Sequence, residues 1–329
     1  MNHPITTLLG IQHPVIMAPM FLVSNEAMMS AAIKSGIAGT FPSLNFRKEG
    51  ELHALLERLN AVRDAHPGGI YGVNLIVQKT NPLYKKHLDA CVAAKVPFYI
   101  TSLGNPREVI DAAHSYGAKV FCDITNLEHA AKAKQMGADG FIAVTAGAGG
   151  HAGPYPMHVL IPALRKAFPD MPVVAAGGIA SGVQMASAMV LGADGVSIGT
   201  RFIASPEANV SDEYKQAIVD HGMEDIVLTE RLSGTPCNII NTPAAQKLGY
   251  KQSNWEKWLS RNPRTKKYFK MMVQLKGMKM LEKATKPNYY NQLWSAGQSV
   301  EMVDGIEPVA TIIAKLTEEY RQSIQSFCK

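Results

Sequence analysis

The chain has 329 residues, of which 47% are hydrophobic and 18% are charged, and its formal net charge is +6. This composition is typical of a globular protein with enough length for a large core. No apolar run reaches the roughly 18 residues of a membrane span, so we expect no such span. No nucleic-acid reader motif occurs, which argues against nucleic-acid binding.

The cysteines and the amino end indicate the compartment. Residues 1–7 contain neither a basic region nor a long apolar stretch, so we expect no secretion signal. The cysteines are scattered and show no pairing typical of a metal site. We therefore expect a reduced, cytoplasmic protein that binds no metal. The four cysteines are Cys91, Cys122, Cys237 and Cys328.

Short apolar segments alternate with helical patterns over the first 200 residues. Eight such segments read as strands, and apolar residues at helical spacing, as in residues 52–62, mark the helices between them. This alternation favours a (β/α)8 TIM barrel. A doubly wound open sheet is the alternative, but the G-x-G-x-x-G loop that would favour it is absent. The expected strands cover 13–20, 37–41, 71–77, 97–101, 119–122, 140–144, 173–178 and 195–199.

Capping signals mark several helix starts. Ser24 is expected to cap the first helix after the first strand, and Asn105-Pro106 to open a later one. The segments Thr125–Glu128 and Ser181–Gln184 have the form of capping boxes.

A tetrapeptide repeat supports the strand count. Gly-Ala-Asp-Gly occurs at 137–140 and again at 192–195, each time where a helix is expected to end and a strand to begin. Glycine is suited to the left-handed position at such a helix end.

The alternation stops after residue 204. We expect residues 1–204 and 291–329 to form the barrel, with a last helix near 308–327, and 205–290 to form a mostly helical insertion over its mouth. Residues 261–286 include nine basic residues and only one acidic residue. They are interpreted as a solvated helix face, as an attractor of an anionic substrate or nicotinamide cofactor, or as a nucleic-acid surface. The apolar stripe of Tyr268, Met271, Met272, Leu275 and Met278 is interpreted as packing or as an adaptable lid.

The stretch Gly147–Pro154 follows the sixth expected strand and carries a candidate catalytic group. Its glycines allow positive φ and close approach of the backbone to a ligand. His151 lies among them and can exchange a proton near neutral pH. It would abstract a proton from a carbon acid or bind an anionic substrate. The glycines are Gly147, Gly149, Gly150 and Gly153.

Two further glycine loops follow the last two expected strands. In barrels, these loops often bind phosphate through backbone N–H groups. Gly177 and Gly178 lie in the first loop, while Gly199 and Thr200 lie in the second. The alternative is that these glycines only make tight turns.

The first and third strands also contribute residues to the expected mouth. Ala18, Pro19 and Met20 end the first strand and would support a flat ring. Asn74 is an amide in an apolar strand, so its side chain needs partners, either a cofactor or a backbone carbonyl. A flat cofactor with a phosphate, such as flavin mononucleotide (FMN), fits all these positions.

These segments resemble the nitronate monooxygenase family, formerly called 2-nitropropane dioxygenases. The similarity lies in Ala-Pro-Met at 18–20, Gly-Gly-His-Ala-Gly at 149–153, Ala-Gly-Gly-Ile-Ala at 176–180, Gly-Thr-Arg-Phe at 199–202 and the segment 293–300. The resemblance implies an FMN-binding barrel in which the loop histidine is catalytic, a role that falls on His151. It also implies that Gly177, Gly178, Gly199 and Thr200 hold the phosphate and that Ser295 lies close to the flavin.

Three positions depart from the family pattern. The loop there commonly reads G-x-E-A-G-G-H, whereas Thr145 and Gly147 stand at its first and third positions here. Strand five often ends with a basic residue near the flavin, where this chain has Asp123. A charged acid close to the flavin would disfavour its anionic reduced form.

The resemblance implies an FMN-dependent oxidoreductase that oxidises alkyl nitronates, or related small anions, with O2. One alternative is an NAD(P)H-dependent flavin reductase acting on quinones or enoyl thioesters, as in other members of the family. The lysines of 266–286 would then contact the nicotinamide diphosphate or an acyl carrier protein. The non-enzymatic alternative is a barrel that only binds a phosphate ligand. The oligomeric state stays open, with a homodimer among the alternatives.

Overall fold

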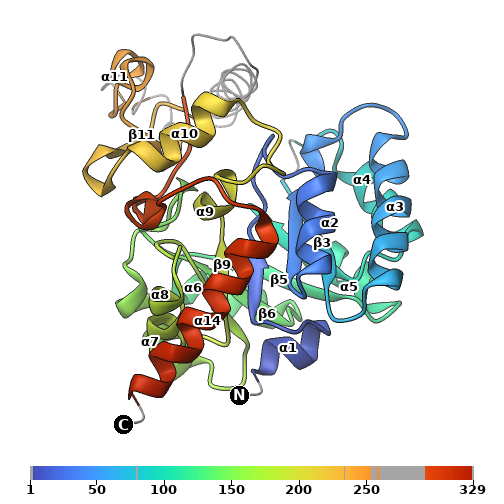
Figure 1. Ribbon diagram of the computed structural model, residues 1–329. Helices are drawn as coiled ribbons and strands as arrows, with labels where there is room; N and C mark the ends of the chain where they lie inside the picture. The colour runs from blue at the N-terminus through green and yellow to red at the C-terminus, as the bar shows by residue number, and fades with distance from the viewer. Residues whose placement is uncertain (1–2, 79–80, 233, 253–257, 259–292, 328–329) are drawn as a thin grey trace.

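The computed structural model describes residues 3–78, 81–232, 234–252, 258 and 293–327. Its centre is a closed barrel of eight parallel strands, which confirms the expected (β/α)8 architecture (Figure 1). Around the ring the strands are β1 (Val15–Met17), β2 (Ala38–Pro42), β3 (Ile70–Ile76), β4 (Phe98–Ser102), β5 (Lys119–Ile124), β6 (Gly140–Val144), β8 (Val173–Ala176) and β9 (Gly195–Ile198).

Helices surround this barrel, and the first helix closes its amino-terminal end. The described helices of the barrel are α1 (Pro4–Leu9), α2 (Glu26–Lys34), α3 (Glu51–Ala65), α4 (Tyr84–Ala93), α5 (Arg107–His114), α6 (Leu127–Gln135), α7 (Met157–Ala167), α8 (Gly182–Val190), α9 (Thr200–Ile203) and α14 (Val309–Phe327). The last of these packs against α8 and α2, so it completes the outer ring (Figure 1).

Side chains alternate between the barrel interior and the surrounding helices. In β5, Phe121 belongs to the inner apolar cluster, while Val120 and Cys122 belong to the outer one. Ile5 of α1 belongs to the inner cluster and packs into the barrel at the end formed by the strands' amino ends. Phe121 needs the space left at Gly140, because a Cβ there would lie 2.6 Å from its ring. The interior is therefore a packed core, and the open end is the one formed by the strands' carboxyl ends, the barrel mouth.

The helix starts agree only partly with the expected caps. Ser181 and Gln184 form the expected capping box of α8. The cap of α2 is Asn25 rather than Ser24, whose hydroxyl instead accepts from the Met20 backbone N–H. The cap of α6 is Asn126, so the capping box expected at 125–128 is wrong. In both errors a neighbouring asparagine reaches the exposed N–H groups first.

The helix start at Asn105-Pro106 also differs by one position. Pro106 is the residue before α5 rather than its first residue, and Asn105 Oδ1 accepts from the Arg107 N–H at 3.0 Å.

The repeated Gly-Ala-Asp-Gly turns carry a structural role that their spacing did not reveal. Asp139 accepts a hydrogen bond from the Val120 N–H at 2.9 Å, and Asp194 accepts one from the Val173 N–H at 2.8 Å. Each aspartate thus binds the first residues of the preceding barrel strand. Arg165 of α7 completes the second of these arrangements by pairing with Asp194.

Replacing Asp194 with alanine is expected to destabilise the fold by about 2–4 kcal/mol. The change leaves the Val173 N–H without its acceptor and Arg165 without its carboxylate. Urea unfolding followed by circular dichroism measures the effect. Glu108→Ala removes the exposed pair with Lys85 and serves as the control. Equal midpoints for the two variants would contradict the role assigned to the repeat.

The segment after α9 lies over the barrel mouth, at the end opposite α1 (Figure 1). Its described part contains α10 (Asp212–Asp220), α11 (Pro243–Leu248) and two strands that the sequence did not indicate, β10 (Ile226–Thr229) and β11 (Cys237–Ile240). These strands form a small antiparallel sheet with β7 (Gly150–His151) of the barrel. The division into 1–204 with 291–329 and 205–290 stays a prediction.

Several expectations fall outside the described residues. They concern Cys328, the apolar stripe of 268–278 and the basic residues of 261–286. Within the described part, no helix combines the length and the apolar character that crossing a bilayer requires. Cys91, Cys122 and Cys237 are buried free thiols.

Candidate active site at the barrel mouth

The ends of β1 and β9 meet at the mouth. Ala18, Pro19 and Met20 are all partly exposed there, and the Ala18 N–H donates to the Ile198 carbonyl at 2.8 Å. A Cβ at Gly199 would lie 3.6 Å from the Ala18 Cβ and 3.8 Å from the Met20 sulfur. The structure therefore places these sequence-predicted residues side by side.

The loop after β8 contains two glycines in the left-handed region, with different surroundings. Gly177 has φ +108°, and a Cβ there would lie 2.4 Å from the Ala148 nitrogen. Gly178 has φ +76°, and a Cβ there would meet nothing closer than the Gly147 Cα at 3.9 Å. Gly177 is thus needed for packing, while Gly178 leaves open space in front of its backbone.

These positions fit a phosphate group. Thr200 is buried, and its hydroxyl oxygen accepts from the Gly297 N–H at 3.0 Å, so its own proton remains available to donate. Gly178 and Gly199 leave room that a side chain would fill. Backbone N–H groups in such a cradle bind phosphate oxygens. Gly178, Gly199 and Thr200 are therefore the residues that would hold the phosphate of a flavin.

His151 lies on a strand rather than on a free loop. It pairs with Cys237 of β11 in an antiparallel register, and Gly150 pairs with Asn238. The next residue is also held, since the Ala152 N–H donates to the Pro236 carbonyl at 3.2 Å. The insertion thus fixes the backbone that carries the candidate catalytic histidine.

The glycines around His151 have a different purpose from the one expected. Among the four, only Gly150 takes a positive φ, of +68°. A Cβ at Gly149 would lie 2.7 Å from the Gly297 nitrogen, and one at Gly153 would lie 2.0 Å from the Val144 carbonyl oxygen. The expectation of positive φ is wrong for Gly147, Gly149 and Gly153, which allow close packing of backbone on backbone.

Gly147, where the family pattern has glutamate, follows the same rule. A Cβ there would lie 3.0 Å from the Gly178 nitrogen, so a larger residue would push against the loop that holds the phosphate cradle. The departure at this position is therefore matched to how this loop packs.

The electrostatics of His151 favour a neutral imidazole. Burial lowers the pKa of His151 below its usual value of 6.5, although its side chain remains accessible to solvent. A neutral imidazole near pH 7 can accept a proton from a substrate.

Asn238 is a functional residue that the sequence reasoning missed. Its amide Nδ2 donates to two carbonyls of the glycine–histidine loop, Ala146 at 3.0 Å and Ala148 at 2.8 Å. The backbone carbonyl of Asn238 accepts from the Ala296 N–H at 3.3 Å. The available signal was an amide inside the apolar run 237–240, the same signal that Asn74 presents.

Replacing Asn238 with alanine is expected to lower stability by about 2–3 kcal/mol and turnover by about tenfold or more. The variant leaves the Ala146 and Ala148 carbonyls without their donor and loosens the loop that carries His151. Thermal unfolding and steady-state kinetics measure the two effects. Asn241→Ala, which removes a hydrogen bond from Tyr250 within the insertion, is the control. Unchanged turnover in Asn238→Ala would contradict the assignment.

Ser295 belongs to the last part of the chain, before α14, and lies at the site. It bridges to Ile239 of β11, and its carbonyl accepts from the Tyr214 hydroxyl at 2.6 Å. A Cβ at Gly150 would lie 3.9 Å from the Ser295 hydroxyl oxygen. Ser295 is therefore brought next to the histidine strand, and its closeness to a flavin stays a prediction.

Asn74 lies on the other side of the mouth and is satisfied within the protein. Its Nδ2 donates to the Ile100 carbonyl at 3.2 Å and to the Ser102 hydroxyl at 2.7 Å. The backbone alternative therefore holds for one donor, the other is taken by a serine hydroxyl, and only Oδ1 remains for a cofactor. Ser102, which the sequence did not single out, donates in turn to Asp123 Oδ2 at 2.5 Å. Burial raises the pKa of Asp123 to about 6.

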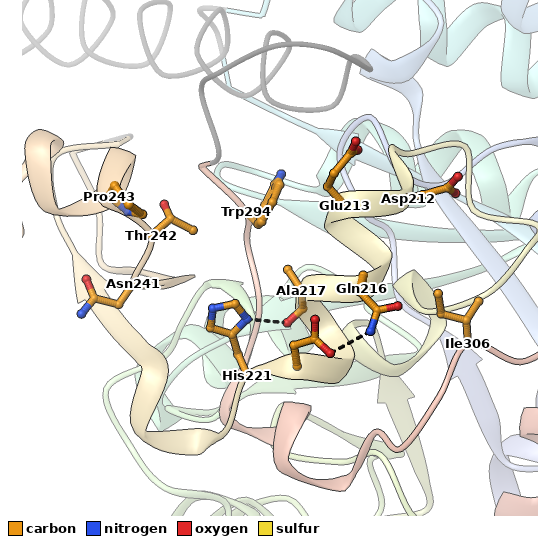
Figure 2. Close-up of a pocket in the computed structure, with 11 residues that line it drawn as sticks. Asp212, Glu213, Gln216, Ala217, His221, Asn241, Thr242, Pro243, Trp294 and Ile306 are labelled. Atoms are coloured by element: carbon orange, nitrogen blue, oxygen red, sulfur yellow. Dashed lines mark hydrogen bonds between the residues drawn. The ribbon is translucent and has the colours of Figure 1, made fainter.

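A separate recess of about 630 Å³ lies beside α10 and contains none of the sequence-predicted site residues. Figure 2 shows Asp212, Glu213 and Gln216 along this helix, with Thr242 facing them across the recess and Trp294 between. His221, which also lines it, is hydrogen-bonded to the Ala217 carbonyl at 2.9 Å. The recess offers carboxylates and an indole but no group in common with the barrel mouth.

Comparisons with known proteins identify the family of the chain. The profile of the nitronate monooxygenase family matches residues 56–319. Over 247 residues the chain is 31% identical to the (3aS,4S,5R,7aS)-5-hydroxy-7a-methyl-1-oxo-octahydro-1H-indene-4-carboxyl-CoA dehydrogenase of Mycobacterium tuberculosis, covering 74% of this chain and 68% of that protein. It is 23% identical to a probable nitronate monooxygenase of Staphylococcus aureus, covering 98% of both chains.

The solved structure of FabK from Thermotoga maritima superposes with a TM-score of 0.84 at 28% identity, covering 99% of this chain and 98% of that one. The barrel, the glycine loops at its mouth and the extent of the family match lead to one conclusion. The chain belongs to the nitronate monooxygenase family of flavin-dependent oxidoreductases.

Proposed function

We propose that this protein is an FMN-dependent oxidoreductase that oxidises alkyl nitronates with O2. The observation that carries the proposal is the position of His151, which β11 holds at the mouth of the barrel, in the loop that packs against Gly178 and Thr200. The family match and the similarity to a probable nitronate monooxygenase support it. Family membership argues against a barrel that only binds a phosphate ligand.

FMN is proposed rather than a larger flavin because the cradle suits a terminal phosphate. Gly178, Gly199 and Thr200 would bind it, while Ala18, Pro19 and Met20 would line the space above β1. Gly150 and Ser295 would border the cofactor on the histidine side, and Asn74 would offer its Oδ1 from β3. When bound, the flavin supplies the electron acceptor for the substrate.

His151 would act directly on the substrate. In its neutral form it donates one N–H to a nitronate oxygen, or accepts a proton from the carbon next to an electron-withdrawing group. The strand pairing with β11 holds the backbone of His151 in place, so this residue loses little conformational entropy when the substrate binds.

A second candidate, a flavin enzyme acting on a coenzyme A thioester, is favoured by a specific observation. The CoA dehydrogenase relative is 31% identical, against 23% for the probable nitronate monooxygenase, although it covers less of the chain. A neutral His151 is suited to abstract a proton from the carbon next to a thioester carbonyl. This candidate extends the alternative of a flavin reductase for quinones or enoyl thioesters.

The deciding experiment measures oxygen uptake by the FMN-loaded protein given propyl-2-nitronate and no NAD(P)H. Rapid uptake is expected from a nitronate monooxygenase. No uptake with the flavin intact would overturn the first proposal. Anaerobic bleaching of the flavin by a saturated acyl-CoA would then support the thioester candidate, and bleaching by NADH alone would support the reductase. FMN against FAD is decided by mass spectrometry of the released cofactor.

A further inference from the structure

Three side chains form a continuous hydrogen-bonded row across neighbouring barrel strands. Asn74 of β3 donates to Ser102 of β4 at 2.7 Å, and Ser102 donates to Asp123 of β5 at 2.5 Å. Ser102 and Asp123 each lie two residues beyond an inward-facing residue, Ile100 and Phe121. Because side chains alternate along a strand, both point to the inside of the barrel at its mouth.

Asn74 determines which atoms donate and which accept in this row of hydrogen bonds. Both of its amide protons are used, one by the Ile100 carbonyl and one by Ser102. The Ser102 oxygen is therefore an acceptor, and its single proton goes to Asp123 Oδ2. The other carboxyl oxygen, Oδ1, has no hydrogen-bond partner within the described part of the chain, and the residue is partly exposed. The row thus presents one carboxyl oxygen to the mouth.

No cation of the described residues offsets this carboxyl. On β5 its titratable neighbour is Cys122, whose thiol stays protonated because burial raises its pKa to about 11. From β4 it is faced by Ser102, and on β6 the residue in register is Ile142. The loop after β6 contributes His151, whose pKa is lowered. The charged groups of the adjoining helices α5 and α6 contact other residues. The contacts are Arg107 with Asp111, Glu108 with Lys85, Glu128 with Lys132, His114 with Asp139, and Lys134 with the Phe168 ring.

The position of the row relates it to the bound flavin. Three strands separate β4 from β9 in either direction around the ring, so Ser102 lies opposite the phosphate cradle at Gly199. A cofactor held by its phosphate at β8 and β9 and lying across the mouth would therefore bring its ring toward β4 and β5. This step rests on the cofactor placement proposed above.

We propose that Asp123, oriented by Ser102 and Asn74, is the group of the mouth that binds a proton when reduction adds negative charge to the flavin. Dithionite, the reductant used in the test, would supply the two electrons to the flavin, and the proton would pass from solvent to Asp123, which is neither oxidised nor reduced. A nearby negative charge favours the protonated carboxyl, so reduction raises the proton affinity of Asp123. Reduction then adds one negative charge fewer to the barrel mouth than it would if Asp123 bound no proton.

The test is the midpoint potential of the flavin-loaded protein as a function of pH, measured by dithionite titration against a reference dye. Proton uptake by Asp123 adds about 29.6 mV per pH unit to the slope of a two-electron couple, since this is the potential of a tenfold change. We expect this additional slope in a pH window that begins near the Asp123 pKa. Asp123→Asn should remove it, because an amide binds no proton in this range. Identical slopes in the two proteins would overturn the proposal.

Ser102→Ala provides a second, independent variant. The Ser102 hydrogen bond favours the charged carboxyl, so its loss should move the steep window to higher pH while keeping its slope. A window that stays in place or moves to lower pH would overturn the proposal, and this variant decides the matter if Asp123→Asn releases its flavin. Neither measurement uses a substrate. Failure of nitronate oxidation therefore leaves the result for Asp123 intact.

Discussion

His151→Asn is expected to retain its flavin while turnover falls by about 10²–10⁴-fold, the range for removal of a general acid or base. Asparagine preserves a polar side chain of similar reach but cannot take up a proton near neutral pH. The backbone pairing of this residue with Cys237 does not depend on the side chain, so the fold and the glycine loops should persist. Flavin absorbance and steady-state kinetics of the purified variant measure both effects.

The pH profile adds a second readout for the same residue. Burial lowers the pKa of His151 from 6.5, so the neutral form should be active above that lowered pKa and kcat/KM should fall as pH decreases through it. This acidic limb should be absent in His151→Asn. His158→Asn, which changes an exposed residue of α7, is the matched control and should behave as the native protein does. Native turnover in His151→Asn would remove His151 from the mechanism.

Gly178→Ala is expected to weaken flavin binding by about 10–100-fold, the equivalent of one charge-assisted hydrogen bond. A Cβ at this position would occupy the open space in front of the backbone, where the phosphate is proposed to bind. Fluorescence titration of the flavin-free protein with FMN measures the affinity.

Backbone strain must be separated from this effect, because alanine at φ +76° is itself unfavourable. Gly117 offers a matched control, with φ +86° and nothing within 4 Å of an added Cβ, in the turn before β5 at the opposite end of the barrel. Gly117→Ala should cost similar stability without changing the affinity for FMN. Equal FMN affinities in the two variants would show that the phosphate lies elsewhere.

The barrel itself was predictable because its signals are local. Each strand is a short apolar run between turn residues, and β6 has the bounds that the sequence indicated, Gly140–Val144. The capping box of α8 was equally readable, since Ser181 and Gln184 need only each other. Errors of one residue arose where two neighbouring polar residues compete for the same N–H groups, as Ser24 and Asn25 do.

The candidate site was predictable only in part. The order of the glycine loops along the chain was enough to predict that they meet at the barrel mouth, because the carboxyl ends of all barrel strands face the same way. The resemblance to a family drew attention to His151 and Ser295. Neither source indicated Ser102 or Asn238, whose roles depend on partners 28 and more than 80 residues away.

The sequence by itself thus determined the alternation of strands and helices and the position of the glycine–histidine stretch after the sixth strand. Only the tertiary structure decided that His151 lies on a strand paired with β11, that Asp139 and Asp194 bind the strands before them, and that Asp123 is connected to Asn74. The physical reason is the distance along the sequence over which each signal acts. Apolar period, caps and turns act over a few residues, whereas a hydrogen bond between distant segments forms only after the closed barrel has brought them together.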